Sequence, residues 1–460
     1  MITFSIIGIL FFVNFVMAAV CSLAAKPHNH VVLENTFPKE QLDHPETLAL
    51  RKTYKKRQFQ LAAGLSGLDC LLFIPMKDSL FMLLFFILLI ITLVASFSLQ
   101  IRYIRKAHEL IIKHDWQLTP QPIRVDTKTV LTKNRRILSK NWFWLSFALF
   151  GIMNLFLFLI VQGTLSWVML ITSLITWLLF LAGWYAVAHL PVRSITDDDS
   201  INQHYNDLTK FYWSLLMVSS SFTFPVIIFI PLISLYVAPT LFMPITIVEL
   251  LLLIAYIVGT FVLLLTLRKK QDQLLNQAPS YRYYGDDEYW RYGIYNNPND
   301  PRLMIPDRIG MNLSINLGKP VGKILVALIG IIMLFAMLIS IVPLYILDYH
   351  PDPLTDRVTD QAVVLDGPMT QKSTIPLADI TKVNLIAQMP QQTVKENGLA
   401  TQHYALGKFR VADRSALLYV SYTSRPVLKI TTKKVTYYYT NKQPRKTKAA
   451  YQKILTERSE

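Results

Sequence analysis

Two carboxylic acids lie inside long apolar stretches of the sequence, Asp69 and Glu249. A charge in the middle of a bilayer costs roughly 2.5–3.5 kcal/mol on insertion scales, so an acid kept there is a candidate functional residue. The two carboxyls could form a proton or cation relay, or coordinate a substrate. Alternatively, Ala63 and Gly67 have the small-xxx-small spacing of close helix packing, and both carboxyls could be neutral groups that hydrogen-bond between helices.

A candidate hinge lies in the apolar stretch 211–237. Three consecutive serines begin at Ser219, and two prolines follow at Pro225 and Pro231. Proline removes a backbone hydrogen bond and kinks a helix, which a membrane tolerates where neighbouring groups or a cavity satisfy the freed carbonyl. The two prolines could therefore form a gating element, and a static kink is the simpler alternative.

No pattern in the sequence indicates a catalytic or metal centre. The consecutive acids Asp197–Asp199 point in different directions, whereas a hard cation needs converging oxygens, so they are expected to cap the following helix. His28 and His30 are a pair without a further ligand in the pattern. Cys21 and Cys70 lie in apolar segments, as small buried residues do. We expect no enzymatic activity, no metal and no cofactor.

The composition indicates a membrane protein. The chain has 460 residues, of which 52% are hydrophobic and 17% charged, against about 25% charged in a typical soluble domain. The formal net charge is +16, but most lysines and arginines flank apolar runs, where they contact anionic lipid headgroups. A bilayer with anionic lipids is thus the expected partner, and nucleic acid is not, since aromatic and basic residues do not interleave as in RNA-binding proteins.

Seven apolar runs are long enough to cross a bilayer, which takes about 20 residues. The runs are 2–25, 80–99, 142–161, 167–187, 211–237, 242–267 and 324–347. The first run lacks the charged start of a signal peptide and is long for one, so we expect it to remain as a span.

An eighth span is expected at 59–75, although this segment is short and contains Asp69. Basic stretches flank it at 51–57 and 102–113. If the segment crosses the membrane, both basic stretches lie on the cytoplasmic side, as the positive-inside rule requires. The expected membrane bundle is then 1–270 plus the last span.

The same rule gives the expected orientation. Arg268–Lys270 marks a cytoplasmic end, and the uncharged turns 162–166 and 238–243 face outside. The N-terminus and everything after residue 347 are therefore expected to be extracellular, in a multi-pass protein of the cell membrane.

Two soluble parts follow from the patterns. In 281–322, apolar residues alternate from Met311 to Leu317 after a turn cluster at 296–301, so we expect a small cytoplasmic β module. This module could recognise a ligand or peptide, or pack on the bundle as a structured plug.

The segment 351–460 changes to short strands followed by a helix at 444–458. The expected strands are 361–365, 372–375, 382–387, 403–410, 416–422, 427–431 and 435–440, with turns that include Asn397-Gly398. Seven strands and a C-terminal helix are the layout of a pleckstrin-homology-like domain. The expected fold class is an α-helical polytopic membrane protein with such a domain at its C-terminus.

A motif in the cytoplasmic segment carries a family resemblance. It runs W-x-x-G-x-Y-x-N-P-N-D-P-R and continues toward the last span. Its residues are Trp290, Gly293, Tyr295, Asn297, Pro298, Asp300, Pro301, Arg302, Arg308, Gly310 and Asn316. The motif resembles a domain of unknown function in multi-pass membrane proteins of Firmicutes, and the C-terminal part is similar to bacterial pleckstrin-homology-like domains. The resemblance implies an envelope role and makes these residues candidates for binding a ligand or partner; it implies no defined reaction.

Proteins of this kind resemble, more distantly, the membrane proteins that give immunity to the sporulation-delaying peptide toxin. Those proteins usually carry a His-Phe-Asn signature in an extracellular loop. The corresponding loop at 162–166 is Gln-Gly-Thr-Leu-Ser and lacks it.

The leading hypothesis is a non-enzymatic envelope protein that senses or protects against a peptide, lipid or cell-wall stress. Candidate partners are a peptide, a cell-wall polymer or another membrane protein. The alternative is a transporter or transport accessory in which Asp69 and Glu249 line a path.

Overall fold

The computed structural model describes residues 2–122, 124, 127–160, 164–192, 194–234, 239–368, 370–390, 393–412 and 414–459. It consists of two compact units. The first comprises 1–17, 61–94 and 327–460, and the second 18–60 and 95–326.

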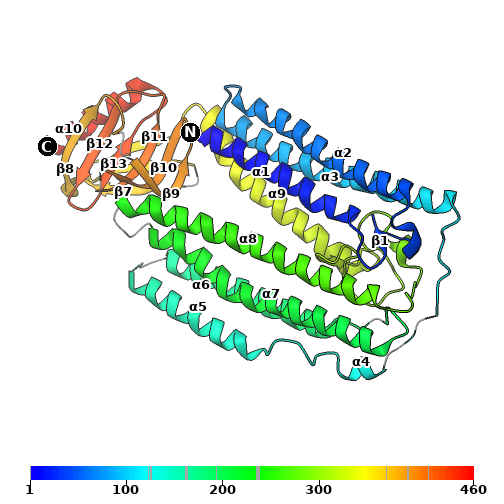
Figure 1. Cartoon of the computed structure of the whole chain (residues 1–460). Helices are drawn as coiled ribbons and strands as arrows, with labels where there is room; N and C mark the ends of the chain where they lie inside the picture. The colour runs from blue at the N-terminus through cyan, green and yellow to red at the C-terminus, as the bar shows by residue number, and fades with distance from the viewer. Residues whose placement is uncertain are drawn as a thin grey trace. The chain divides into compact units, whose positions relative to one another are not determined.

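Seven helices in the described part of the chain are long and apolar enough to cross a membrane (Figure 1). They are α1 (Ile2–Ser22), α3 (Asp78–Lys113), α5 (Asn141–Ile160), α6 (Thr164–His189), α7 (Asp199–Ser234), α8 (Pro239–Asn276) and α9 (Pro320–Tyr349). Large apolar side chains such as Phe335 on α9 and Leu159 on α5 are more than half exposed, as lipid-facing side chains are. The chain is a membrane protein with several spans.

The expected eighth span is helical but differs from these seven. It forms the second half of α2 (Pro45–Asp69) and the 3-10 turn η3 (Cys70–Phe73). The first half of α2 is basic, so α2 is not among the helices that are apolar enough to cross a membrane. That α2 crosses the membrane therefore remains a prediction. The expected outer turns 162–166 and 238–243 lie partly outside the described residues.

In the second unit, α5 to α8 pack together, α6 against α7 and α7 against α8. Apolar side chains of α6, α7 and α8, including Val187, Trp213 and Leu267, form the contact. Lys210 is 1% exposed and donates to the carbonyls of Val187, Ala188 and Leu190, at 2.6, 3.0 and 2.9 Å. A lysine on α7 therefore satisfies the free carbonyls at the end of α6.

The second unit also holds two small β hairpins and the short helix α4 (Thr127–Leu131). The first hairpin pairs β1 (Val31–Val32) with β2 (Asn35–Thr36), and the second pairs β3 (Met304–Pro306) with β4 (Leu313–Ile315). The 3-10 turn η4 (Asp286–Trp290) precedes the second hairpin. The strand expected from Met311 to Leu317 is thus shorter than its pattern, because pairing with β3 covers three residues only.

The first unit contains the C-terminal β domain. A three-stranded sheet consists of β5 (Thr355–Val358), β6 (Ala362–Asp366) and β7 (Ser373–Pro376). A six-stranded sheet has the order β8-β12-β13-β11-β10-β9. Its strands are β8 (Ile380–Ile386), β9 (Thr393–Ala400), β10 (Tyr404–Val411), β11 (Arg414–Ser421), β12 (Val427–Thr432) and β13 (Thr436–Tyr439). Strands β11 and β13 are parallel and the other pairs antiparallel.

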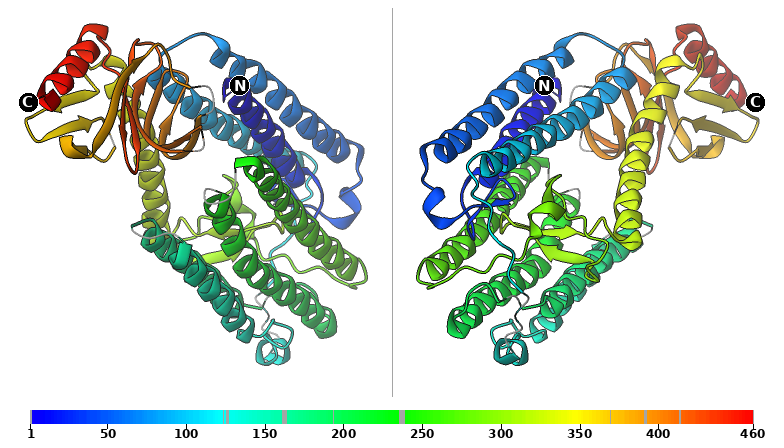
Figure 2. Two further views of the ribbon diagram at one scale, coloured as in Figure 1. Left: turned by 90° about the vertical axis from the view of Figure 1, so that its left-hand side faces the viewer. Right: turned by 90° about the vertical axis from the view of Figure 1, so that its right-hand side faces the viewer.

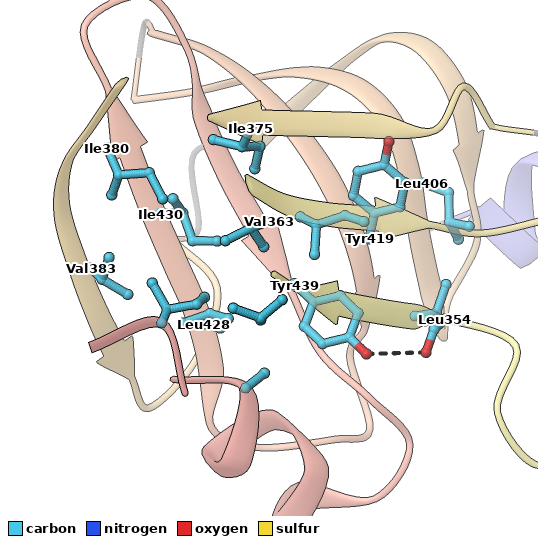
Figure 3. Packing of buried hydrophobic residues seen from close by; sticks show 14 of the residues in the cluster. Leu354, Val363, Ile375, Ile380, Val383, Leu406, Tyr419, Leu428, Ile430 and Tyr439 are labelled. Atoms are coloured by element: carbon cyan, nitrogen blue, oxygen red, sulfur yellow. Dashed lines mark hydrogen bonds between the residues drawn. The ribbon is translucent and has the colours of Figure 1, made fainter. Parts of the chain in front are cut away.

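Two apolar clusters pack the strands of the β domain, and Figure 3 shows residues of the larger one. Val363, Leu406 and Leu428 are completely buried in it. The hydroxyl of Tyr439 donates to the carbonyl of Leu354 at 3.1 Å, so this aromatic ring is buried without an unpaired polar group. Helix α10 (Pro444–Ser459), drawn in red in Figure 2, lies against β5, β8 and β12.

All seven strands expected in this domain, and its helix, are confirmed. Two strands were missed, β5 and β9. The turn expected at Asn397-Gly398 is wrong, because both residues lie within β9. A Cβ on Gly398 would lie 2.0 Å from the carbonyl oxygen of Leu406. Glycine at this position therefore lets β9 and β10 approach closely, near the place where their pairing register shifts.

Candidate functional site

The segment after α1 folds back tightly in the second unit. Asn29, His30, Leu33 and Glu34 have left-handed backbones, which turn the chain twice within six residues. Val32, Leu33 and Phe37 are at most 1% exposed and pack with side chains of α2 and α3. The part of α3 beyond residue 99 thus packs its apolar face against this segment.

A buried arginine joins this segment to the motif region. Arg308 donates to the carbonyl of Glu34 at 2.8 Å, to the hydroxyl of Thr36, and to Asp287 Oδ1 at 2.7 Å. Asp287 in turn accepts from the backbone N–H and hydroxyl of Thr36, at 2.9 and 2.7 Å. The side chains of Arg308 and Asp287 are 11% and 15% exposed. We call this set of four residues the Arg308 cluster.

A second set of contacts joins the same segment to the end of α8. His28 Nδ1 lies 2.9 Å from Asp272 Oδ1, and the same oxygen accepts from the N–H of Asn29 at 3.1 Å. Burial lowers the pKa of His28, which is 2% exposed. Gly310 packs on this ring, since a Cβ there would lie 2.5 Å from His28 Nε2. Arg268 of α8 also donates to the carbonyls of Leu23 and Lys26.

The other motif residues build the turn before β3. Arg302 Nε donates to Asp300 Oδ1 at 2.7 Å, and the hydroxyl of Tyr295 donates to Asp300 Oδ2 at 2.9 Å. Burial opposes ionisation of Asp300, but the hydrogen bonds from Arg302 and Tyr295 outweigh it and lower its pKa to about 2. Tyr295 also packs with Trp290 and Ile305. These side chains are engaged within the turn itself.

Asn316 closes this turn. Its amide donates to the carbonyls of Asn297 and Arg302 at 2.9 and 3.1 Å, and its oxygen accepts from the N–H groups of Asn297 and Gly318 at 3.0 and 2.9 Å. It is fully buried. Among the motif residues, Pro298 and Pro301 are exposed, and Gly293 is half-buried with a left-handed backbone.

A cavity of about 180 Å³ lies among the loop after α1, helices α7 and α8, and the motif region. Its lining mixes basic, acidic and aromatic groups and includes His28, Tyr205, Lys210, Arg302, Asp307 and Arg308. Beside it, burial raises the pKa of Asp307 to about 6 and that of Glu34 to about 8. Glu34 is 2% exposed, and its Oε2 has no hydrogen-bond partner among the described residues. The region can therefore hold a proton at neutral pH.

Asp69 lies in a different polar cluster, in the first unit. The amide of Asn14 on α1 donates to Asp69 Oδ2 at 2.7 Å and to Ser66 at 3.2 Å, and Thr92 of α3 donates to Asn14 Oδ1 at 2.7 Å. Asp69 is 1% exposed. This is the hydrogen-bonded arrangement between helices that the sequence offered as the alternative to a relay.

Glu249 and the two prolines lie in the second unit. Glu249 is half-buried on α8, without a hydrogen bond or ion pair to another described residue. Pro225 and Pro231 lie within α7; nothing is described of the side chain of Pro231. Nearby, Ser220 and Tyr256 share a hydrogen bond of 2.6 Å between α7 and α8. Asp69 and Glu249 therefore belong to different units of the structure.

Sequence reasoning missed several residues of these clusters. They are Asn14, Glu34, Thr36, Thr92, Asp272 and Asp287. Asn14 is the one strongly polar residue of α1, which was a usable signal. The others stand among many polar residues, and only their spatial partners mark them. No group of three His, Cys, Asp or Glu side chains in the described ranges is placed to hold a metal ion.

Comparison with known proteins identifies two parts of the chain. Residues 298–323 match a family of unknown function (DUF5808), and residues 355–454 match a bacterial PH domain. The first match begins in the turn closed by Asn316 and ends inside α9, and the second covers β5 to α10. No curated protein and no solved structure matches the chain. The C-terminal β domain is thus similar to pleckstrin-homology domains of bacteria.

Proposed function

We propose that this chain is a non-enzymatic protein of the bacterial cell membrane that senses or protects against a peptide, lipid or cell-wall stress. The observation that carries the proposal is the Arg308 cluster. Arg308 and Asp287 are bonded to the segment after α1, and Arg302 and Asp300 are bonded to each other, so these charged groups serve internal contacts. Together with the contacts of His28 and Arg268, they fasten the ends of several helices to one another.

The chain connects these contacts to the β domain through one helix. The motif region runs directly into α9 at Pro320, and β5 begins at Thr355, soon after α9 ends at Tyr349. One helix thus joins the β domain to the region held by Arg308. A ligand that binds the β domain and displaces α9 would act on the Arg308 cluster.

The proposal includes eight crossings, with α2 as the eighth. His28 follows α1 and contacts Asp272 at the end of α8, so an even number of crossings should separate them. The apolar helices between them are α3, α5, α6, α7 and α8, and α2 supplies the sixth crossing. In the first unit, Gln402 contacts Thr3, and an even number of crossings between these two residues again requires that α2 crosses.

The orientation follows from charge. The chain near His28 carries Lys26, and the last turns of α8 near Asp272 carry Lys269 and Lys270, so the positive-inside rule would put this side in the cytoplasm. The N-terminus and the β domain would then be extracellular.

The test is growth of a deletion strain against a panel of envelope-active peptides and cell-wall inhibitors. The strain is complemented with wild type, with Arg308→Gln, and with the double variant Asp69→Asn/Glu249→Gln, at matched protein levels. We expect hypersensitivity of the deletion strain, rescue by wild type and by the double variant, and poor rescue by Arg308→Gln. Failure of the double variant alone would favour transport through a path with these carboxyls. A deletion strain without altered sensitivity would contradict the proposal.

A further inference from the structure

A larger cavity, of about 610 Å³, lies within the first unit. Its walls come from the start of α1, the turn between η3 and α3, the later part of α9 and the β domain. Most of the lining is apolar and includes Ile6, Phe73, Met82 and Leu344. A volume of this size is in the usual range of ligand sites, which is about 300–1,000 Å³.

One buried carboxylate in this lining has an unused acceptor. Asp78 is 8% exposed, and its Oδ1 lies 2.9 Å from His403 Nδ1. Its Oδ2 is buried without a hydrogen-bond partner among the described residues. A buried acceptor without a donor is destabilising, and more so when it is charged, so a ligand that brings a donor relieves this cost.

The charges of the lining indicate what kind of ligand fits. Asp78 is the one charged residue in the described lining, and the polar remainder consists of hydroxyls and an amide, such as Thr3, Ser340 and Gln402. A cationic group with apolar neighbours is complementary to this surface. A phospholipid headgroup is less so, because its phosphate would meet no lysine or arginine there.

A strand edge adds a way to hold a peptide. Strand β9 is at the edge of the six-stranded sheet, and Gly398, Leu399 and Ala400 at its end line the cavity. The unpaired side of an edge strand can hydrogen-bond an extended peptide, while pockets beside it take alternate side chains.

We propose that this cavity binds a segment of a cationic amphipathic peptide, with one ammonium or guanidinium group against Asp78 and apolar side chains against Ile6, Phe73 and Leu344. This deepens the proposed function, on which it rests, by naming the ligand class. In the proposed orientation the cavity is open to peptides that arrive from outside the cell.

The experiment uses the full-length protein in phosphatidylcholine nanodiscs and a dansyl-labelled amphipathic peptide of leucine and lysine. Binding is followed by fluorescence anisotropy for wild type and three variants. Asp78→Asn keeps the shape of the side chain and removes its charge. Ser340→Phe fills the cavity and leaves Asp78 in place. Asp360→Asn is the matched control, since Asp360 is exposed and outside the lining.

We expect Asp78→Asn to weaken binding about tenfold or more, as loss of one partner of a buried charge pair does. Ser340→Phe should weaken it similarly, and Asp360→Asn should bind as wild type does. A peptide with glutamine in place of lysine should lose the sensitivity to Asp78→Asn.

Wild-type affinity in both cavity variants would overturn the proposal, as would equal affinity for the lysine and glutamine peptides. Loss of peptide binding in nanodiscs enriched in phosphatidylethanolamine would instead identify the cavity as a lipid site. The growth test is independent of these outcomes. If the deletion strain showed no altered sensitivity to envelope-active agents but peptide binding depended on Asp78, the proposed function would be contradicted and the peptide site would not.

Discussion

Arg308 is the residue whose loss should cost most in the region around the motif. Its substitution by glutamine removes the cationic partner of Asp287 and the guanidinium donor to the carbonyl of Glu34. Breaking a buried ion pair in this way costs about 3–5 kcal/mol. We expect Arg308→Gln to lower the unfolding temperature in detergent markedly, measured by differential scanning fluorimetry.

Lysine should not replace this arginine. One ammonium group cannot donate at once to Asp287, Thr36 and the carbonyl of Glu34 in the geometry of a guanidinium. Arg308→Lys is therefore expected to be destabilised as well. Arg291→Gln, at an exposed position of the same region, is the control and should unfold as wild type does. Equal unfolding temperatures for Arg308→Lys and wild type would mean that charge alone suffices.

Glu34 should make stability depend on pH. Burial raises its pKa from 4.5 to about 8, so the folded protein keeps a proton that the unfolded chain has released, and the free energy of unfolding falls as pH rises across this range. Asp307 acts in the same direction only up to about pH 6. His28, whose pKa is lowered, acts in the opposite direction only below 6.5. Of these three groups, Glu34 alone acts between pH 6.5 and 8.

The measurement compares unfolding of wild type and Glu34→Gln between pH 6.5 and 8. Wild type should lose up to about 1.4 kcal/mol per pH unit there, the limit for one proton, whereas Glu34→Gln should be flatter. The exposed Glu40→Gln serves as control and should keep the wild-type slope. Parallel profiles for wild type and Glu34→Gln would show that Glu34 is ionised in the folded protein.

At this scale, single residues were predictable only where their chemistry is unusual for its place. Asp69 stands out because a carboxyl in an apolar helix is rare, but its partners Asn14 and Thr92 come from other helices. Arg308 and Asp300 were marked by a motif, and the sequence could not tell a ligand site from an internal ion pair. That difference depends on what is buried beside each charge.

Strand β9 carries the sharpest prediction among the elements. A Cβ on Gly398 would meet the carbonyl oxygen of Leu406 at 2.0 Å, and this backbone atom cannot move without shifting the β9–β10 ladder. Gly398→Ala should therefore destabilise the β domain by about 1–3 kcal/mol. Gly330→Ala on α9 is the matched control, because nothing lies within 4 Å of its Cβ position. Limited proteolysis compares the stability of the two variants. Equal resistance of Gly398→Ala and Gly330→Ala to the protease would contradict the inference that a side chain at residue 398 strains the sheet.

The same glycine explains why β9 was missed. Asn-Gly between apolar residues is the common signal of a hairpin turn, and a glycine needed for close strand approach gives the same dipeptide. The remaining strands were predictable because their core side chains, such as Val363, Leu406 and Ile430, recur with period two. Likewise, the length of the apolar runs predicted the helices of the membrane bundle. It did not predict their ends, because α3, α7 and α8 continue as helices beyond the apolar runs.

The number of crossings is a property of the whole molecule, and contacts test it better than hydropathy does. Apolar length alone leaves α2 out, since half of it is basic. Yet the contacts of His28 with Asp272 and of Thr3 with Gln402 each require an even number of crossings between the paired residues. Both conditions are met when α2 crosses, and neither is met when it does not.

Single exposed cysteines can decide this in intact cells. In a background with Cys21→Ala and Cys70→Ala, the variants Lys77→Cys and Lys433→Cys should react with a membrane-impermeant maleimide added from outside. Lys39→Cys and Gln277→Cys should react only after permeabilisation. If Lys39→Cys and Lys77→Cys were labelled from the same side, α2 would not cross. The contact between His28 and Asp272 would then join opposite sides of the bilayer, which no membrane permits. Labelling of this single pair of variants therefore tests both the crossing of α2 and the contact between His28 and Asp272.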